Sequence, residues 1–331
     1  MIEEILVTTT QNSQVHPHLS VWSWEIPIYL DLGGLTAGIL VLGAVMVLLG
    51  READNRFAVS KLPLWAPIVL SVGMLMLFLD LSVKENVLRF YGTFRWTSPM
   101  SWGSWALLLV YPVAILMVLV SLREGYPRLA RILEAIPGIT ALTEFARARR
   151  RGVALFTLLV GVFLGLYTGI LLSSYVARPF WNSGVLPLLF LASGLSAGAA
   201  VTMLLARDEG EQRRFAQIVI TVLSVKLVLV ALYVINLATG SRAQIDSLQL
   251  IFDGPFTTPF WVLFVGVGIV LPIILIALQL RIGRQIWMLV TPVLVIFGGY
   301  TLRDVMVKAG QMSTFRSYEN VFDPALLSLL Q

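Results

Sequence analysis

The amino-acid sequence predicts an all-α polytopic membrane protein, with eight transmembrane helices arranged as two tandem four-helix bundles. Of its 331 residues, 57% are hydrophobic and only 13% are charged. A soluble domain of this size needs more polar surface than that composition supplies. Eight apolar stretches of about 20 residues each are long enough to cross the hydrocarbon core of a bilayer. An internal duplication then divides the eight helices into two sets of four.

The helices follow one another along the chain. We place them at residues 26–50, 62–81, 103–122, 152–175, 184–206, 215–238, 257–280 and 286–307. The first bundle therefore covers residues 26–175 and the second covers 184–307, between an outer N-terminal segment (1–25) and an outer C-terminal tail (308–331). The start of the chain lacks the basic region of a cleaved signal peptide, so we expect the first helix to be retained.

The charge of the loops predicts the direction of the helices. Fifteen of the 24 basic residues fall in the loops after helices one, three, five and seven. Because basic loops stay in the cytoplasm, both termini are expected on the periplasmic side of the inner membrane. The longest of these loops, residues 123–151, is predicted to form short helices on the anionic inner leaflet, or to be a plain orientation anchor. This distribution explains the net charge of +5 without a nucleic-acid partner.

The two halves of the sequence match at a constant offset of 160 residues, which makes residues 27–38 correspond to residues 187–198. Further matches are Pro99 with Pro259 and Pro112 with Pro272. An even number of helices in each copy predicts a parallel repeat. The runs at 33–38 and 193–198 consist mostly of Gly, Ser, Thr and Ala, and we expect them to let helix backbones approach closely.

Acidic residues break the repeat. The acids Glu25, Asp31 and Asp80 of the first copy correspond to Val185, Leu191 and Gly240 of the second. An acid in a membrane helix is costly to desolvate, so it is expected to have a partner or a function. We therefore expect the first copy to hold a polar site that the second copy lacks. Lys226 is a charged exception in the second copy, predicted to face the bundle interior and to meet a carboxylate or backbone carbonyls.

The candidate site residues are predicted to gather at the outer face of the membrane. They are Glu25, Tyr29 and Asp31 at the start of helix one, Asp80 at the end of helix two, His18 and Trp24 before helix one, and Arg303 near the end of helix eight. Carboxylates can exchange protons, Tyr and His can donate hydrogen bonds, and aromatic rings can line a flat ligand. These are the groups that a quinone site requires.

Several of these residues also have a purely structural interpretation. Trp24 suits the aromatic belt at a membrane interface. Asp80 could simply cap its helix or form an ion pair at the start of the following loop. His18 could be an exposed residue of the N-terminal tail. Asp31 lies more than a turn inside its helix, so we expect it to be paired, protonated or facing a wet pocket.

The sequence also argues against a metal centre in this chain. Its two histidines, His16 and His18, both precede the first helix, and it has no cysteine. Haem b is usually bound by buried histidines, and iron–sulfur clusters are bound by cysteine thiolates. We therefore expect no metal ligands here, and electrons would have to come from another protein and pass directly to a bound small molecule.

Several short runs, spread over nearly the whole chain, resemble a known family. They are Trp22-Ser-Trp-Glu-Ile-Pro, Ser98-Pro-Met-Ser-Trp-Gly, Tyr167-Thr-Gly, Pro179-Phe-Trp-Asn, Gly298-Gly-Tyr-Thr-Leu-Arg and Ala309-Gly-Gln. In these runs the sequence resembles the NrfD/polysulfide reductase family of membrane subunits. The Ser-Pro-Met-Ser-Trp-Gly run and the tryptophan-proline opening are the most specific of them.

The resemblance implies a haem-free subunit that exchanges electrons with menaquinone or ubiquinone at the outer face of the membrane. It also implies an extrinsic, ferredoxin-like iron–sulfur subunit as partner, linked to a molybdopterin catalytic subunit or a multihaem cytochrome. Of the family's pocket residues, it extends to Glu25, Tyr29 and Asp80 only. We expect the loop 81–102 and the tail 315–331 to dock the cluster-bearing subunit.

The interpretation we prefer is a quinone-reactive membrane anchor. In it Asp80 and Glu25 exchange protons, Tyr29 and His18 donate hydrogen bonds, and Arg303 pairs with an acid. One alternative is a parallel-repeat secondary transporter that uses Asp31 and Lys226, whose helices would be interrupted at corresponding prolines of both halves. Another is a scaffold subunit without bound quinone, or one that couples distant redox chemistry to ion movement.

Overall fold

The fold is known from a computed structural model, which describes residues 22–282 and 287–313. These residues contain eight helical segments that are long and apolar enough to cross a membrane, and no β-strand, which confirms the predicted fold class. The segments are α2 (Glu25–Leu48), α3 (Trp65–Asp80) preceded by η1 (Phe57–Lys61) and η2 (Leu62–Leu64), α5 (Pro99–Val120), α9 (Arg150–Ser173), α10 (Leu186–Leu205), α11 (Glu209–Ala238), η4 (Thr258–Val270) continued by α13 (Leu271–Ile282), and α14 (Trp287–Met312).

Some helices begin or end outside the predicted limits. Helix α11 starts six residues before the predicted 215, because the Asp208 side chain accepts a hydrogen bond from the Glu211 backbone N–H at 2.7 Å and caps the helix. Helix α14 continues past the predicted 307 to Met312. Apolar stretches locate membrane spans, whereas caps decide where a helix stops.

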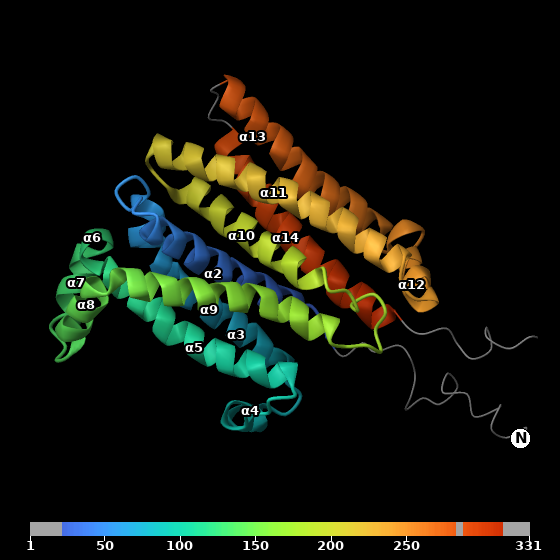
Figure 1. The fold of residues 1–331 in the computed structure, drawn as a ribbon, viewed down its shortest axis with the longest axis horizontal. Coiled ribbons are helices and arrows are strands. Elements are labelled where there is room, and N and C mark those ends of the chain that lie inside the picture. Colours follow the sequence, from blue (N-terminus) through green and yellow to red (C-terminus); the bar gives the residue numbers. More distant parts are fainter. Residues whose placement is uncertain (1–21, 283–286, 314–331) are drawn as a thin grey trace, which may run out of the picture.

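Shorter helices lie between the spans. The predicted helices within residues 123–151 are present as α6 (Leu122–Gly125), α7 (Pro127–Leu133) and α8 (Ile139–Ala148), and they lie together at one end of the molecule (Figure 1). The connections after the second and sixth spans also contain helices, which we did not predict. They are η3 (Lys84–Asn86), α4 (Val87–Gly92) and α12 (Arg242–Phe252), the last of which opens on a capping box of Ser241 and Gln244.

The helices pack in two groups. Helices α2, α3, α5 and α9 form one group, and α10, α11, η4–α13 and α14 form the other (Figure 1). The groups meet where α2 packs against α10 and α14, and where α9 packs against α10. We propose that the groups are the two copies of the predicted repeat.

Glycines bring α2 and α10 into contact where the groups meet. A Cβ atom at Gly38 would overlap the backbone of Gly194, and a Cβ atom at Gly194 would overlap the backbone of Gly34. Gly198 packs equally closely on Gly38. These residues belong to the two corresponding small-residue runs, so the predicted close backbone approach is confirmed.

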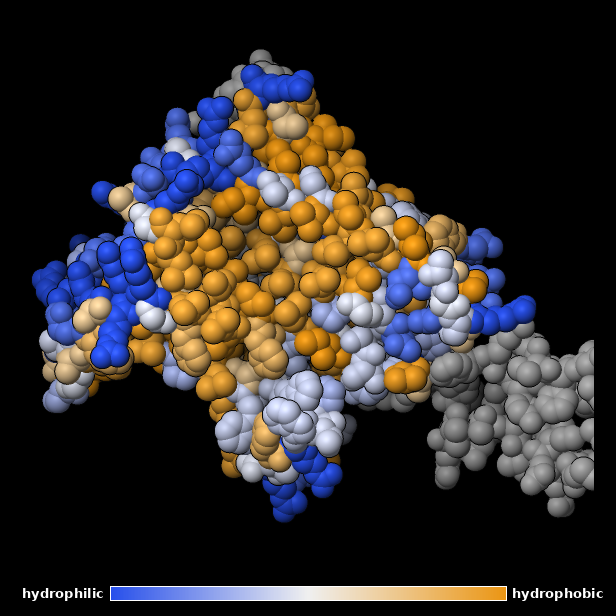
Figure 2. Space-filling view, in the orientation of Figure 1, coloured by the Kyte–Doolittle hydropathy of each residue, from blue (hydrophilic) through white to orange (hydrophobic). Residues whose placement is uncertain are grey.

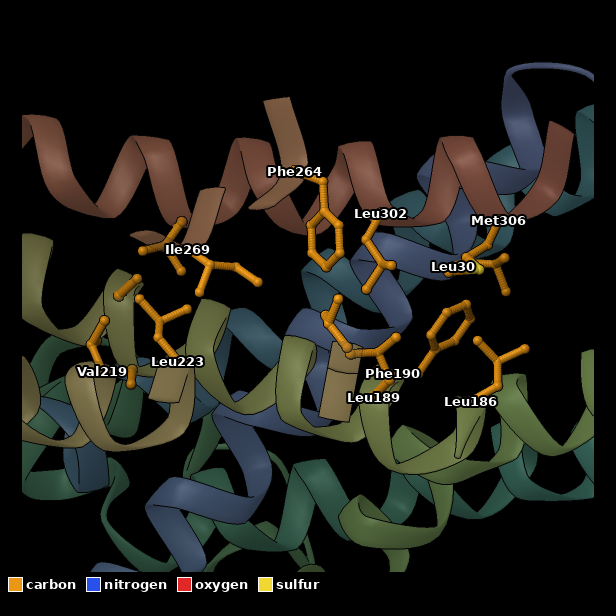
Figure 3. Packing of buried hydrophobic residues seen from close by; sticks show 14 of the residues in the cluster. Leu30, Leu186, Leu189, Phe190, Val219, Leu223, Phe264, Ile269, Leu302 and Met306 are labelled. Atoms are coloured by element: carbon orange, nitrogen blue, oxygen red, sulfur yellow. The ribbon is translucent and has the colours of Figure 1, made fainter. Parts of the chain in front are cut away.

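The surface and the core both fit a membrane protein. Figure 2 shows a broad hydrophobic surface over the middle of the helices, with hydrophilic residues gathered toward their ends. Below it, side chains from both groups form a continuous core that includes Leu30, Phe190, Leu223, Phe264 and Leu302 (Figure 3). The helices therefore associate by close packing and expose apolar side chains to lipid.

The two ends of the spans carry different short helices. We call the end where α2 starts and α3 finishes the Glu25 end. We call the opposite end, where α2 finishes and η1 starts, the Arg56 end. Helices α6, α7 and α8 lie at the Arg56 end, whereas α4 and α12 lie at the Glu25 end (Figure 1).

Candidate functional site

A cavity of about 720 Å³ opens at the Glu25 end, within the group formed by α2, α3, α5 and α9. Its walls are mostly apolar, with Ile26 and Leu30 from α2, Phe78 from α3, Leu107 from α5 and Leu171 from α9. Helix α4 and the segment before it form part of the rim, through Val83 and Tyr91. An apolar cavity of this size is suited to a flat, largely hydrophobic ligand.

A few polar groups interrupt the apolar walls. Tyr29 lies one turn into α2, and Asp80 is the last residue of α3. Ser71, Ser104 and Tyr91 also line the cavity. Burial raises the pKa of Tyr91, so its hydroxyl remains a protonated hydrogen-bond donor at neutral pH. The site therefore combines hydroxyl donors with one carboxyl group.

A second carboxylate lies close to Asp80. Glu25, the first residue of α2, is near enough to interact electrostatically with Asp80, which accepts a hydrogen bond from the backbone N–H of Ser23. The Oε2 atom of Glu25 is buried and meets no hydrogen-bond partner among the described residues. Two half-buried acids thus influence each other electrostatically at this end of the molecule.

The depth of the cavity depends on a close contact between α5 and α9. A Cβ atom at Gly103 would overlap the ring of Tyr167, and both residues line the cavity. Only glycine leaves room here for the hydroxyl end of this ring against α5. Gly103 ends the Ser-Pro-Met-Ser-Trp-Gly run and Tyr167 begins the Tyr-Thr-Gly run, so two of the runs that carry the family resemblance meet at this wall.

Three of the four remaining runs meet beside the cavity. The Trp22 ring, which lines it, lies 5.4 Å from the Trp181 ring and 6.1 Å from the Tyr175 ring, measured between centroids. The Gln311 side chain accepts a hydrogen bond from the Trp22 backbone N–H at 2.9 Å and donates one to the Trp22 carbonyl at 3.0 Å. The Trp181 indole N–H donates to the Met306 carbonyl at 2.6 Å. Residues far apart in sequence therefore hold this wall in place.

The structure places the predicted site residues in different surroundings. Tyr29 and Asp80 line the cavity, and Glu25 lies next to Asp80. Trp24 is 51% exposed and does not line the cavity, where Trp22 lies instead. His18 lies outside the described residues.

Asp31 and Arg303 lie in a different place, at the contact between the two helix groups. The Arg303 guanidinium donates hydrogen bonds to the Asp31 carboxylate, the Ser193 hydroxyl and the Gly299 carbonyl at 3.0 Å each, and to the Leu30 carbonyl at 2.9 Å. The prediction that Arg303 pairs with an acid is confirmed, and that acid is Asp31.

Lys226 joins this arrangement from α11. Its ammonium group donates to the Ser193 hydroxyl at 3.2 Å and lies 5.0 Å from the centroid of the Phe264 ring. Lys226 is fully buried, as predicted, although its hydrogen-bond partner is a hydroxyl rather than a carboxylate or carbonyl. We call Asp31, Ser193, Lys226 and Arg303 the buried ion cluster.

Sequence reasoning missed several residues of the cavity wall. Ser71, Tyr91 and Ser104 carried no signal of their own, because a serine or tyrosine is common in membrane helices and loops. Tyr167 was visible only as part of a motif. Ser71 and Ser104 belong to different helices, so only the packing of α3 and α5 around one cavity relates them.

The fold and the site together define a class: an all-helical, multi-pass membrane protein with an apolar, carboxylate-bearing cavity at one end of its first four helices. The comparison with protein families is more specific. The chain belongs to the polysulphide reductase NrfD family, whose model matches residues 11–314.

Individual relatives match over most of their length. The sequence is 29% identical over 308 residues to one chain of the polysulfide reductase of Wolinella succinogenes, covering 88% of this protein and 94% of the relative. It is 30% identical over 288 residues to protein NrfD of Escherichia coli, covering 80% and 87%. It is 26% identical over 321 residues to one subunit of the selenate reductase of Mesobacillus selenatarsenatis, covering 87% and 73%.

Proposed function

We propose that this protein is the quinone-reactive membrane subunit of a respiratory oxidoreductase complex. It would exchange electrons between an extrinsic iron–sulfur subunit and a membrane quinone at the periplasmic face. Family membership supports the role in a complex, because two relatives are by name parts of a polysulfide reductase and a selenate reductase. The proposal of quinone binding rests on the cavity at the Glu25 end.

The cavity residues fit a quinone in size and in chemistry. Its volume of about 720 Å³ lies within the usual range for small-molecule sites. A quinone ring presents an apolar face and two carbonyl oxygens. Apolar side chains of α3 and α9 can cover the face, while the hydroxyls of Tyr29 and Tyr91 can donate to the oxygens. When bound, the quinone supplies the redox chemistry that amino-acid side chains lack.

The two neighbouring carboxylates suit proton exchange with that ligand. Asp80 is on the cavity wall, where it can hold a proton next to a quinone oxygen. Glu25 directly follows the exposed residues Ser23 and Trp24 and interacts electrostatically with Asp80, so it can pass that proton on toward water. A positioned carboxyl group of this kind typically accelerates proton transfer by about 10²–10⁴-fold.

The distribution of basic residues supports a cavity that faces the periplasmic side of the membrane. Arginines gather at the Arg56 end, in the loops where a cytoplasmic location is expected. The Glu25 end, with the cavity, would then face the periplasm. There the loop 81–102, which includes α4, lies at the cavity rim, and an iron–sulfur partner docked on it would be close to the quinone.

The transporter interpretation finds less support. It requires interrupted helices at corresponding positions in both halves, but α5 continues through Pro112, whereas Pro272 follows the wide turns of η4. Arg303, moreover, directs four hydrogen bonds to protein groups inside the buried ion cluster. That arrangement is suited to holding helices together more than to releasing an ion.

The experiment that tests the proposal replaces Asp80 by Asn in the intact complex. Quinone turnover should fall by about 100-fold, since the amide cannot exchange a proton, while the complex still assembles. Asp253→Asn is a matched control, because Asp253 is an exposed acid at the same end of the molecule, outside the cavity wall and the loop 81–102. Unchanged turnover in Asp80→Asn, or an equal loss in both variants, would rule out the assigned role of Asp80.

A further inference from the structure

A second cavity, of about 910 Å³, lies at the Arg56 end. Its walls come from η1 and the connection before it, from α6 and α8, from the ends of α5 and α9 at this side, and from the start of α11 with the connection before it. Unlike the cavity at the Glu25 end, it is lined by many charged side chains. The basic ones are Arg56, Lys61, Arg147, Arg150 and Arg207, and the acidic ones are Glu52, Glu124, Asp208 and Glu211.

The acidic side chains of this second cavity are already engaged by the protein. Glu52 pairs with Arg150 at 2.9 Å, and Glu124 pairs with Arg147 at 2.8 Å. Asp208 caps α11, as described above, and also lies 3.7 Å from Arg214.

Glu211 is engaged in a different way, because it binds backbone groups rather than a cation. Its carboxylate accepts hydrogen bonds from the backbone N–H groups of Phe57 and Ala58, at 3.1 and 2.9 Å. Each acidic side chain on the wall therefore already has a basic or backbone partner within the protein.

Three of the basic side chains have no such partner. No carboxylate in the described part of the chain lies within ion-pair distance of Arg56, Lys61 or Arg207. A fourth, Arg147, uses one guanidinium nitrogen on Glu124, while its Nη1 atom is buried and meets no hydrogen-bond partner among the described residues. Arg56, Lys61 and Arg207 thus line one cavity without an ion-pair partner among the described residues.

We propose that this cavity binds the phosphate group of an anionic phospholipid. Arginine and lysine are the residues that bind phosphate, arginine through its planar fork of donors. The proposal does not depend on the function of the Glu25 end, because it rests only on residues at the opposite end.

The neighbouring helices favour a lipid over a free phosphate ion. The α6–α8 segment, which contributes Glu124 and Arg147 to the wall, also exposes Ile136, Leu142 and Phe145. These apolar side chains are 38–52% exposed and would be covered by acyl chains at the membrane interface. A lipid headgroup can reach the cavity from there, and Figure 2 shows hydrophilic residues next to apolar ones at this end of the molecule.

The test measures lipid binding to the full-length protein, purified together with its partners, by native mass spectrometry. Phosphatidylglycerol and phosphatidylcholine with the same acyl chains are compared, and phosphatidylglycerol should bind more tightly. A basic side chain that donates directly to a bound phosphate contributes about fivefold or more to binding. The variant Arg56→Gln/Lys61→Gln/Arg207→Gln should therefore bind phosphatidylglycerol about 100-fold more weakly.

A matched control removes the same charge from the same end of the molecule. Arg128, Arg131 and Arg281 are exposed basic residues that do not line the cavity. Because they cannot donate directly to a phosphate bound there, their replacement by Gln should change binding by less than about threefold. Equal weakening in both triple variants would overturn the proposal, since general surface charge would then account for it. Equal binding of the two lipids would overturn it as well.

Inorganic phosphate separates the two sources of the phosphate group. Millimolar phosphate should displace little phosphatidylglycerol if the lipid is the ligand. Full displacement, with the same loss in the cavity variant, would show a free-phosphate site and overturn the lipid assignment. Unchanged helical content by circular dichroism shows that the cavity variant is folded, so that its loss of binding counts in favour of the proposal.

Discussion

Two regions on opposite faces of α2 use ionisable groups in different ways. Tyr29 and Asp31 are two residues apart, and at about 100° per residue they point to opposite sides of the helix. Tyr29 faces the cavity at the Glu25 end, whereas Asp31 faces α14 and pairs with Arg303. A buried acid is thus not sufficient evidence for a functional site, because the protein itself satisfies Asp31.

The polar groups near the cavity and those of the buried ion cluster differ in how far the protein satisfies their hydrogen bonds. In the cluster, Asp31 and Ser193 both accept hydrogen bonds from Arg303, and Ser193 also accepts one from Lys226. In the cavity region, one carboxylate oxygen of Glu25 is buried without a hydrogen-bond partner among the described residues. One face of α2 therefore holds the two helix groups together, while the opposite face lines the cavity for a ligand.

The largest effect is expected from breaking the cluster at its only carboxylate. Asp31→Leu would leave Arg303 and Lys226, two buried cations, without an acid, and removing one partner of a buried pair costs about 3–5 kcal/mol. The variant should unfold at a lower temperature in detergent and should be recovered from membranes in much lower yield than the parent protein.

Arg303→Met is the internal comparison for that prediction. It should cost less than Asp31→Leu, because Lys226 already shares Ser193 with Arg303 and can move toward Asp31. The double variant Asp31→Leu/Arg303→Met should recover part of the loss, since the corresponding position in the second copy is already apolar, as Leu191. Equal stability of Asp31→Leu and the parent protein would contradict the role of the cluster.

A smaller effect is expected at the cavity wall. Gly103→Ala would force the Tyr167 ring to move, and such overpacking costs about 1–3 kcal/mol. Because this ring lines the cavity, affinity for a quinone analogue should fall by about tenfold or more, as measured by fluorescence quenching or calorimetry. Gly33→Ala is the matched control, since no heavy atom lies within 4 Å of its added Cβ. A larger loss of affinity in the control would refute this reading of the wall.

The smallest effect is expected from removing one hydroxyl. Tyr29→Phe should weaken quinone-analogue binding by about fivefold, which corresponds to one neutral hydrogen bond of about 1 kcal/mol, while leaving stability nearly unchanged. Tyr126→Phe deletes the same group at the Arg56 end, where the Tyr126 hydroxyl donates to the Lys61 carbonyl at 3.1 Å, and should not alter binding. Identical affinities for Tyr29→Phe and the parent would show that Tyr29 only packs against the ligand.

Local pattern predicted much of the architecture. The number and order of the spans follow from apolar length alone, and the close contact between α2 and α10 follows from their small-residue runs. The pairing of Arg303 with an acid was also within reach, because a charged side chain in a membrane helix requires a partner. Which acid it meets was not, since Asp31 is 272 residues away in sequence.

The sequence by itself determined that this protein has eight segments able to cross a membrane and that Glu25, Asp31 and Asp80 have no acidic counterpart in the second copy, because hydropathy and residue identity are local properties. Only the tertiary structure decided that Tyr29 and Asp80 share a cavity while Asp31 is paired inside a helix contact. The reason is geometric: the rotation of each helix about its axis is set by the shape of its neighbours, and a rotation by about two residues would exchange the two faces of α2.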